Sequence, residues 1–390
     1  MPDGYEISGK SVRVYFYWEG KVCKERIGSK TQLNIDKAKR LSEIIRYELK
    51  EGSFDYSRHF PDSPRVKKST FGHYLDVLLA IKKNELAASS YRSENQKSEK
   101  YIKPRWGSYN IEKIDHLEIQ EWIQEELRNT HKLASKTIKD IVSIVRQVFN
   151  LYCTNTKKTF NPANGIKIKL PDKQDPDPFT LNEIKKILDT PTTRVQELNL
   201  MRFAIWDGPR ISEVLALAWE DVVSVEKGIV RYERAKVLGK YKATKTRRST
   251  RTHTLLKPAR EALQEQFRLT GHLKPIEIEY TDRDNQTIRT KKLRFVFLNT
   301  QSLKPHKGDQ DIRERFWETH LKRAEVRYRP PSQSRHTFIS QMLSTGAIPL
   351  HWISDHVGHS TIDMIQKTYG KWIKADGADL HQTIEKIFDL

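Results

Sequence analysis

Two proline-rich and charged stretches divide the chain and most constrain how it can fold. PDSPRVKKS at 61–69 and NPANGIKIKLPDKQDPDPF at 161–179 lack apolar periodicity long enough for a strand or a helix. This composition is typical of linkers. A single hydrophobic core also stops growing well before 390 residues. We therefore expect three domains, spanning 1–62, 70–160 and 175–390.

The first segment contains a short pattern of alternating residues. SVRVYFYW at 11–18 places apolar side chains on one face and Arg13, Tyr15 and Tyr17 on the other, which predicts a strand. After a turn, KVCKERI predicts a second strand, on which Lys24 and Arg26 share a face.

A helix is expected next, because apolar residues from Ile35 to Leu49 recur at helical spacing behind a plausible cap at Asn34. The result is a small basic hairpin plus a helix. Its aromatic and basic face could enter a DNA groove. An ordinary hairpin with packed tyrosines explains the same pattern equally well.

The second segment reads as helical throughout. Thr70 is expected to cap a helix that continues to Ile81, and Ser135 one that continues to Tyr152. Further helical patterns cover 91–102 and 117–127. Basic residues follow these helices, and we select Lys136 and Lys139 as phosphate contacts. A run of charge is usually a solvated helix face, so each signal is weak by itself.

The third segment opens with a capping box formed by Thr180 and Glu183. The rest is predicted to be mostly helical, with strand-like runs at GIVRYERAKV, THTL and LRFVFLN. The expected fold class is mainly α with small β-sheets (α+β).

Charge and cysteine content limit the partners and the compartment. Lys+Arg total 70 against 50 Asp+Glu, a formal net charge of +20, which favours a polyanionic partner through counterion release. Cys23 and Cys153 lie far apart, which suggests neither a disulfide framework nor a zinc site, so a reducing compartment is expected. We find no apolar run of membrane-spanning length and no signal segment after Met1, and we expect a soluble cytosolic protein.

Residues suited to phosphate chemistry gather in the third segment. In GPRISEV, Arg210 stands at the start of a predicted helix that continues through ISEVLALAW, and Glu213 lies three residues on, where it can orient the guanidinium. By itself such a pair is a common surface salt bridge. Arg335 in SRHTFIS supplies a second guanidinium, followed by His336.

A basic stretch lies between two strand-like runs and predicts a hairpin with cations at its tip. The cations are Lys242, Lys245, Arg247, Arg248 and Arg251. A lysine whose pKa is lowered by such neighbours could protonate a departing 5′ oxygen. Nonspecific contact with the DNA backbone is the commoner role for any one of them.

The segment DHVGHSTIDMIQKTYGKW adds His359 and, ten positions later, Tyr369. A tyrosine, two arginines, a lysine and a histidine, without a metal-ligand cluster in the sequence, predict attack of the phenolic oxygen on a phosphodiester. A lone tyrosine or histidine is usually structural. The combination and its order along the chain favour catalysis.

These segments resemble the successive signature motifs of the tyrosine recombinase, or phage integrase, family. The resemblance is carried by GPRISEVLALAWEDV, ATKTRRSTRTHTL, SRHTFISQML and DHVGHSTIDMIQKTYGKW. The helical region at 70–155 resembles the core-binding domain of that family, and roughly the first 60 residues resemble its N-terminal arm-binding domain.

The resemblance implies a role for each matching residue. Arg210 and Arg335 would clamp the phosphate, Lys245 would be the general acid, His359 a hydrogen-bond donor to the phosphate, and Tyr369 the nucleophile. It implies no cofactor and no metal.

The sequence departs from the family pattern at one position. Ser332 stands where the family has its first histidine. Serine is no proton carrier near neutral pH, so we predict a positioning role for Ser332 and expect His359 to take the tyrosine proton.

The resemblance also implies partners. They are double-stranded DNA carrying attachment sites, three further copies in a homotetramer on DNA, and, as assisting factors, a host DNA-bending protein and a directionality factor. The expected place is the bacterial cytoplasm, in association with the nucleoid. An amphipathic tail helix after Gly377 would dock on a neighbouring protomer or fold back on its own domain.

The predicted activity is integration or excision of a mobile element such as a prophage, through a 3′-phosphotyrosine intermediate. A type IB-like DNA-relaxing enzyme and a noncatalytic DNA-binding regulator are the alternatives. Two binding domains before the catalytic one favour site-specific recombination.

Overall fold

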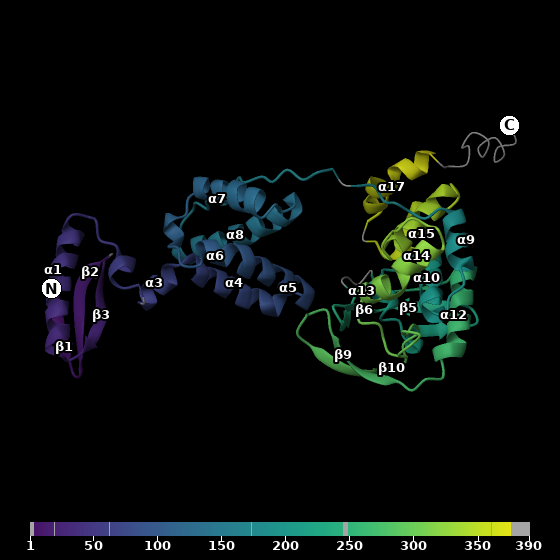
Figure 1. The fold of residues 1–390 in the computed structure, drawn as a ribbon, viewed down its shortest axis with the longest axis horizontal. Coiled ribbons are helices and arrows are strands. Elements are labelled where there is room, and N and C mark those ends of the chain that lie inside the picture. Colours follow the sequence, from purple (N-terminus) through teal and green to yellow (C-terminus); the bar gives the residue numbers. More distant parts are fainter. Residues whose placement is uncertain are drawn as a thin grey trace. The chain divides into compact units, whose positions relative to one another are not determined.

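The computed structural model describes residues 4–18, 20–61, 63–172, 174–244, 249–359 and 361–375. Contacts divide the chain into two compact units, Met1–Lys83 with Ser90–Pro171 and Asn84–Ser89 with Asp172–Leu390 (Figure 1). The described part is mainly α-helical with small β-sheets, as predicted. The division into three domains stays a prediction.

The first unit begins with a three-stranded antiparallel sheet in the order β1-β2-β3. Its strands are β1 (Gly4–Ser8), β2 (Ser11–Trp18) and β3 (Lys21–Ser29). The alternation predicted for β2 is confirmed, because Val12, Val14 and Phe16 are buried against α1 (Gln32–Lys50) (Figure 1). The short strand β1 was not predicted, since its five residues, GYEIS, carry too little alternation to stand out.

Two local predictions in this region need correction. The cap of α1 is Thr31, whose hydroxyl accepts from the backbone N–H of Asn34, while the Asn34 side chain donates to Ser29 O (2.8 Å). The stretch 61–69 is partly helical, because α3 (Pro64–Ser69) begins on a proline, which the first turn of a helix tolerates. A short helix, α2 (Tyr56–His59), precedes it.

The helical part of the first unit confirms the predicted pattern with one shift at a helix start. The Thr70 hydroxyl accepts from the N–H of His73 (3.2 Å) and caps its helix as expected. Ser135 is the first helical residue, and Ala134 takes the cap position without a side-chain bond. The elements are α4 (Phe71–Glu85), α5 (Ala88–Lys97), η1 (Ser98–Ile102), α6 (Lys103–Trp106), η2 (Ile111–Lys113), α7 (His116–Trp122), η3 (Ile123–Thr130) and α8 (Ser135–Thr156).

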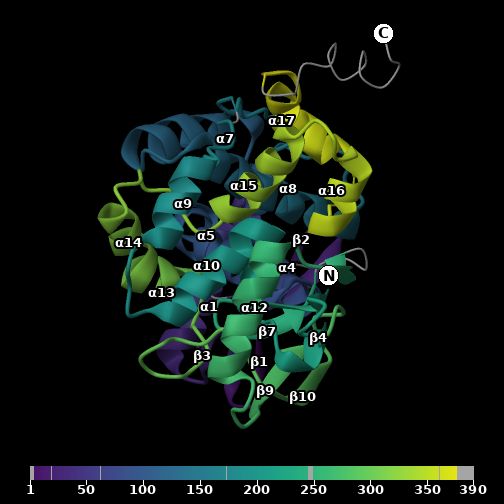
Figure 2. The same cartoon turned by 90° about the vertical axis from the view of Figure 1, so that its right-hand side faces the viewer.

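The second unit is built around helices that pack side by side. The capping box of Thr180 and Glu183 is present and opens α9. Helix α10 packs against both α12 and α15, and α16 and α17 lie at the end of the unit opposite β9 and β10 (Figure 2). The helices are α9 (Leu181–Asp189), α10 (Val195–Asp207), α11 (Ile211–Val214), η4 (Trp219–Asp221), α12 (Lys257–Thr270), α13 (Asp309–Ile312), η6 (Arg313–Trp317), α14 (Glu318–Arg323), α15 (Gln333–Ser344), α16 (Leu350–Val357) and α17 (Asp363–Ala375).

Two small sheets complete this unit, in the orders β4-β5-β8 and β10-β9-β7-β6. The strands are β4 (Val222–Ser224), β5 (Ile229–Tyr232), β6 (Arg234–Val237), β7 (Lys240–Ala243), β8 (Arg251–Thr254), β9 (Ile276–Thr281) and β10 (Ile288–Leu293). The predicted hairpin at 242–251 is wrong, because β7 and β8 belong to different sheets. The two described ends of the basic stretch, Lys242 on β7 and Arg251 on β8, therefore belong to different sheets.

The apolar run LRFVFLN is also not the predicted strand. Strand β10 ends at Leu293, and the run then makes only an isolated bridge between Phe295 and Ala218. Phe295, Val296 and Phe297 are all buried. Continuous apolar residues signal burial, and they do not by themselves specify the backbone conformation.

The described residues contain no helix long and apolar enough to cross a membrane. The predicted tail helix after Gly377 lies outside the described residues.

Candidate active site

A tight turn presents Arg210 at the end of α10. Gly208 has φ +69°, in the left-handed region, and a Cβ there would lie 2.5 Å from the Phe338 ring, so the turn requires glycine. Arg210 then caps α11, which is a single turn rather than the longer helix predicted. Its side chain remains 43% exposed and donates from NH1 to Glu213 Oε1 (2.9 Å).

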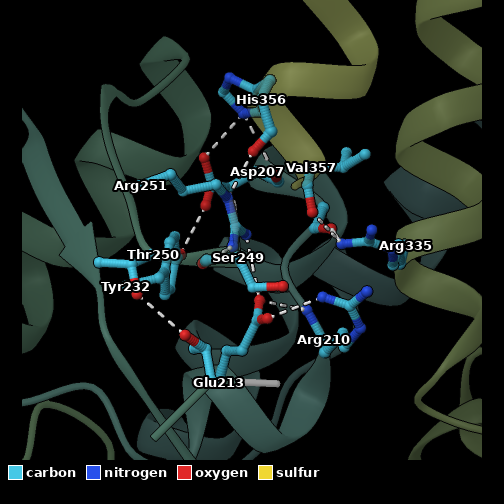
Figure 3. Close-up of polar contacts among 12 residues, drawn as sticks. Asp207, Arg210, Glu213, Tyr232, Ser249, Thr250, Arg251, Arg335, His356 and Val357 are labelled. Atoms are coloured by element: carbon cyan, nitrogen blue, oxygen red, sulfur yellow. Dashed lines mark hydrogen bonds and ion pairs between the residues drawn. The ribbon is translucent and has the colours of Figure 1, made fainter. Parts of the chain in front are cut away.

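Glu213 is buried between two guanidinium groups (Figure 3). Besides Arg210, it accepts from Arg251 NH2 at Oε2 (3.1 Å). Burial by itself would raise the pKa of Glu213, but the charges of Arg251 and Arg210 outweigh it and lower the pKa. The carboxylate therefore stays ionised and holds both arginines in place.

Arg251 links this carboxylate to the other side of the site. Its Nε donates to His356 O (2.6 Å), and its NH1 donates to Ser249 O (3.1 Å). In the sequence, Arg251 stands out only as one cation of the basic stretch. Its distinct role depends on contacts across 105 residues of chain, which no local pattern signals.

Arg335 is the buried member of the arginine pair. From α15, its NH1 donates to Gly208 O (3.1 Å) and to Val357 O (2.7 Å), joining the Arg210 turn to the end of α16 (Figure 3). Its NH2 has no hydrogen-bond partner among the described residues. Burial, and then the charge of Arg210, lower the pKa of Arg335 to about 9. A buried guanidinium with an unused donor is suited to an anion.

An aspartate and two histidines form hydrogen bonds next to the Arg210 turn and the end of α16. Asp207 Oδ1 accepts from His253 Nε2 (2.7 Å). The same oxygen accepts from His356 Nε2 (3.1 Å), and Oδ2 accepts from the Tyr232 hydroxyl (2.6 Å) (Figure 3). Burial favours a raised pKa, but His253 and then His356 lower the pKa of Asp207. The carboxylate thus remains charged in the interior.

Among the described residues, Asp207, His253 and His356 form a group that could hold a metal ion, since one ligand atom from each lies within 4.8 Å of the others. The sequence predicted no such cluster. The contacts form a hydrogen-bonded network in which the Asp207 carboxylate accepts three donors. No local sequence pattern signals this network, because its three residues lie on α10, β8 and α16, far apart in the chain.

Tyr369 lies inward on α17 and is 1% exposed. Its hydroxyl hydrogen-bonds with Nδ1 of His336 on α15. Burial raises the pKa of Tyr369, and the nearby Arg335 charge opposes the rise.

His359 follows Gly358 at the end of α16 and is 7% exposed. Burial, and then the charges of Arg335 and Arg210, lower the pKa of His359 to about 3. Its Nδ1 has no hydrogen-bond partner among the described residues. The ring is therefore neutral near pH 7.

Three family models match the chain. Residues 178–372 match the phage integrase family, residues 2–64 an arm DNA-binding domain, and residues 70–127 the N-terminal SAM-like domain of phage integrases. The chain belongs to the phage integrase family. It is a DNA strand-breaking and rejoining tyrosine recombinase, as the motifs predicted.

A curated relative extends the match to nearly the full length. The prophage integrase IntR of Escherichia coli (strain K12) is 32% identical over 397 residues, covering 96% of this chain and 95% of that protein. The tyrosine recombinase XerC-like protein of Caldanaerobacter subterraneus is 27% identical over 282 residues, covering 65% of this chain and 67% of that protein.

Solved structures share the fold. The Tn1549 transposon integrase in complex with a circular intermediate DNA has a TM-score of 0.63 at 17% identity, covering 83% of this chain and 100% of that chain. The lambda integrase tetramer bound to a Holliday junction has a TM-score of 0.58 at 14% identity, covering 97% of both chains.

The remaining predicted site residues of the second unit differ in exposure, and three of them lie outside the described residues. Ser332 is exposed, directly before α15, and makes no side-chain cap there. Lys242 is half-buried on β7. Lys245, Arg247 and Arg248 lie outside the described residues.

Residues predicted to contact DNA in the first unit also differ in their surroundings. The β2–β3 register pairs Arg13 with Arg26 and Tyr15 with Lys24, which brings these four side chains to one face, and Tyr17 is 59% exposed. On α8, Lys136 is paired with Asp140 (2.6 Å), and Lys139 is exposed.

Proposed function

We propose that this recombinase cuts and rejoins DNA at the attachment sites of a mobile element, such as a prophage, with Tyr369 as nucleophile. One observation carries the proposal. A buried tyrosine near the charge of Arg335 shares a compact unit with a second, exposed arginine, and the pKa of the Glu213 carboxylate that pairs with this arginine is lowered by the surrounding guanidinium groups. This arrangement can place a nucleophile and fixed positive charge on one phosphate.

The reaction conserves the phosphodiester bond energy. The Tyr369 hydroxyl gives its proton to a general base as its oxygen attacks phosphorus. The bond to the 5′ oxygen breaks, and the electron pair of that bond leaves with the 5′ oxygen, which takes a proton from the general acid. The products are a 3′-phosphotyrosine and a free 5′ hydroxyl. The 5′ hydroxyl of another strand then attacks the phosphotyrosine and restores the tyrosine.

Each proposed catalytic residue has one task. Arg210 and Arg335 bind the nonbridging oxygens, with Glu213 orienting Arg210 and Arg251. Lys245 protonates the 5′ oxygen, and His359 donates a hydrogen bond to the phosphate. Ser332 is exposed and contributes only to positioning.

DNA recognition is assigned to the three predicted domains. Residues 1–62 bind arm-type sites through the β2–β3 face, 70–160 bind the core site with Lys136 and Lys139, and 175–390 perform the chemistry. We propose a homotetramer as the active assembly on DNA. A host bending protein and a directionality factor would assist it in the bacterial cytoplasm at the nucleoid.

Covalent trapping tests the proposal. The protein is mixed with DNA from the flanks of its own gene, because an integrase gene often borders the attachment site. The parent should form a protease-sensitive 3′ adduct, with EDTA present, and Tyr369→Phe should form none. An adduct that persists in Tyr369→Phe would refute the assignment of the nucleophile.

A nicked suicide substrate carrying the bound sequence decides the remaining case. If the parent binds this substrate but forms no adduct on it, the proposed cleavage by Tyr369 at that attachment site fails.

A further inference from the structure

The proposed nucleophile has a hydrogen-bond partner to which the sequence motifs assigned no catalytic role. The Tyr369 hydroxyl contacts Nδ1 of His336, and the two residues lie on α17 and α15, which pack against each other. His336 directly follows Arg335, so the same helix carries one member of the phosphate clamp and this imidazole. The contact joins residues 33 positions apart in the chain.

Tyr369 needs a proton acceptor, because its own environment opposes ionisation. Burial raises the pKa of its hydroxyl, and the charge of Arg335 offsets this only in part. A neutral phenol is a weak nucleophile, and general-base assistance removes its proton during attack.

The two other candidates for this task fit poorly. Ser332 is exposed, and a hydroxyl does not accept a proton near neutral pH. His359 has a pKa lowered to about 3 by burial and by Arg335 and Arg210, so its ring is a weak base. His359 is better suited to donate a hydrogen bond to the phosphate, which is its role in the proposed function.

We propose that His336 accepts the proton of Tyr369 during strand cleavage and returns it during strand joining. This inference rests on the proposed function, in which Tyr369 is the nucleophile. As the phenolic oxygen bonds to phosphorus, the lone pair on His336 Nδ1 takes the hydroxyl proton. The 5′ oxygen receives its proton separately, from the general acid.

Strand joining runs the same transfer backwards. The 5′ hydroxyl loses its proton to the conjugate base of the general acid and attacks phosphorus. The bond from phosphorus to the Tyr369 oxygen breaks, and His336 Nδ1–H returns its proton to that oxygen. Ionisable groups near His336 are Tyr369 on α17, His359 after α16, and Arg335 on its own helix.

The test measures single-turnover adduct formation on a nicked suicide substrate. His336→Asn is the main variant, because its amide oxygen can keep a hydrogen bond to the hydroxyl but cannot accept a proton. We expect the rate of adduct formation to fall about 10²- to 10³-fold, with DNA affinity unchanged. His351→Asn is the matched control, since His351 is exposed on α16, and it should retain the parent rate.

A second measurement separates proton transfer from mere positioning. Replacing Tyr369 by 3,5-difluorotyrosine supplies a more acidic phenol, which needs less help from a base. In that background His336→Asn should regain most of its rate, to within about tenfold of the His336 protein. An equally large defect with either phenol would show that His336 only positions Tyr369 and would overturn the inference.

The outcomes distinguish this inference from the proposed function. If Tyr369→Phe still forms the adduct, the proposed function fails. If Tyr369→Phe is inactive while His336→Asn reacts at the parent rate, only the inference fails. An unfolding measurement on each variant ensures that the rates compared come from folded protein.

Discussion

The active site and the basic face of the N-terminal sheet both present basic side chains, but the active site holds them in place while the sheet exposes them to solvent. In the active site, Arg335 is 9% exposed and is held by two backbone carbonyls, and Arg251 is held by Glu213. On the N-terminal sheet, Lys24 and Arg26 are exposed, and Lys24 has an ion pair with Glu6 (3.0 Å) whose two members are both partly exposed.

The difference follows from the task of each region. Stabilising a transition state requires charges fixed before the reaction, in a site where burial strengthens their effect. Binding a DNA backbone requires charges presented to solvent, and flexible side chains suffice for that purpose. Substitutions should therefore change folding and catalysis in the first region and affinity in the second.

The arginine pair gives the largest expected effects. Arg210→Ala and Arg335→Ala should each reduce adduct formation about 10³-fold, because each removes charge from the transition state. Only Arg335→Ala should also lower the free energy of unfolding, by about 3 kcal/mol, since it leaves the Gly208 and Val357 carbonyls unpaired. Suicide-substrate kinetics and urea unfolding measure the two effects. Equal stability losses would contradict the distinction between the buried and the exposed arginine.

The network behind the site should be the next most sensitive. Asp207→Asn should cost about 3 kcal/mol of unfolding free energy, because it removes the buried charge that His253 and His356 contact. Tyr232→Phe deletes only one bond to the same carboxylate and should cost about 1 kcal/mol. Urea unfolding compares the two variants. An unchanged free energy of unfolding in Asp207→Asn would show that the network does not stabilise the site.

Burial of His359 predicts a pH effect on stability. Its folded pKa of about 3 lies below the ordinary histidine value, so the unfolded chain binds the proton first and stability falls as pH drops below about 6.5. Between pH 7 and 5, the parent should lose about 2 kcal/mol more than His359→Gln. Urea unfolding at both pH values measures the difference. Identical losses would exclude this effect.

Charge reversal on the N-terminal sheet should change binding alone. Lys24→Glu combined with Arg26→Glu should lower affinity for arm-type DNA and reduce the slope of log affinity against log salt by about 2. Cleavage of a short core-site suicide substrate should continue at the parent rate. A loss of cleavage on that short substrate would show that these two residues also act in catalysis, against the division between the two regions.

Ser332→Ala should have the smallest effect. Because Ser332 is exposed and makes no cap, the rate of adduct formation should stay within about threefold of the parent. A defect as severe as that of Arg335→Ala would assign Ser332 a direct part in the chemistry.

The sequence by itself determined features that depend on neighbours along the chain. The alternation in β2, the capping box of Thr180 and Glu183, and the apolar spacing of α8 all appeared as expected, because their causes act over a few residues. The order of the motifs around Arg210, Arg335 and Tyr369 also identified the family. The catalytic roles of these residues remain predictions.

Tertiary structure decided which distant residues meet. The sequence could not show that β7 and β8 enter different sheets, since pairing depends on partners elsewhere in the chain. Asp207 and His356 are 149 positions apart, and they meet where Arg335 joins Gly208, directly after α10, to Val357 at the end of α16. For the same reason only the packing of α15 and α17 selects His336, rather than another histidine, as the neighbour of Tyr369.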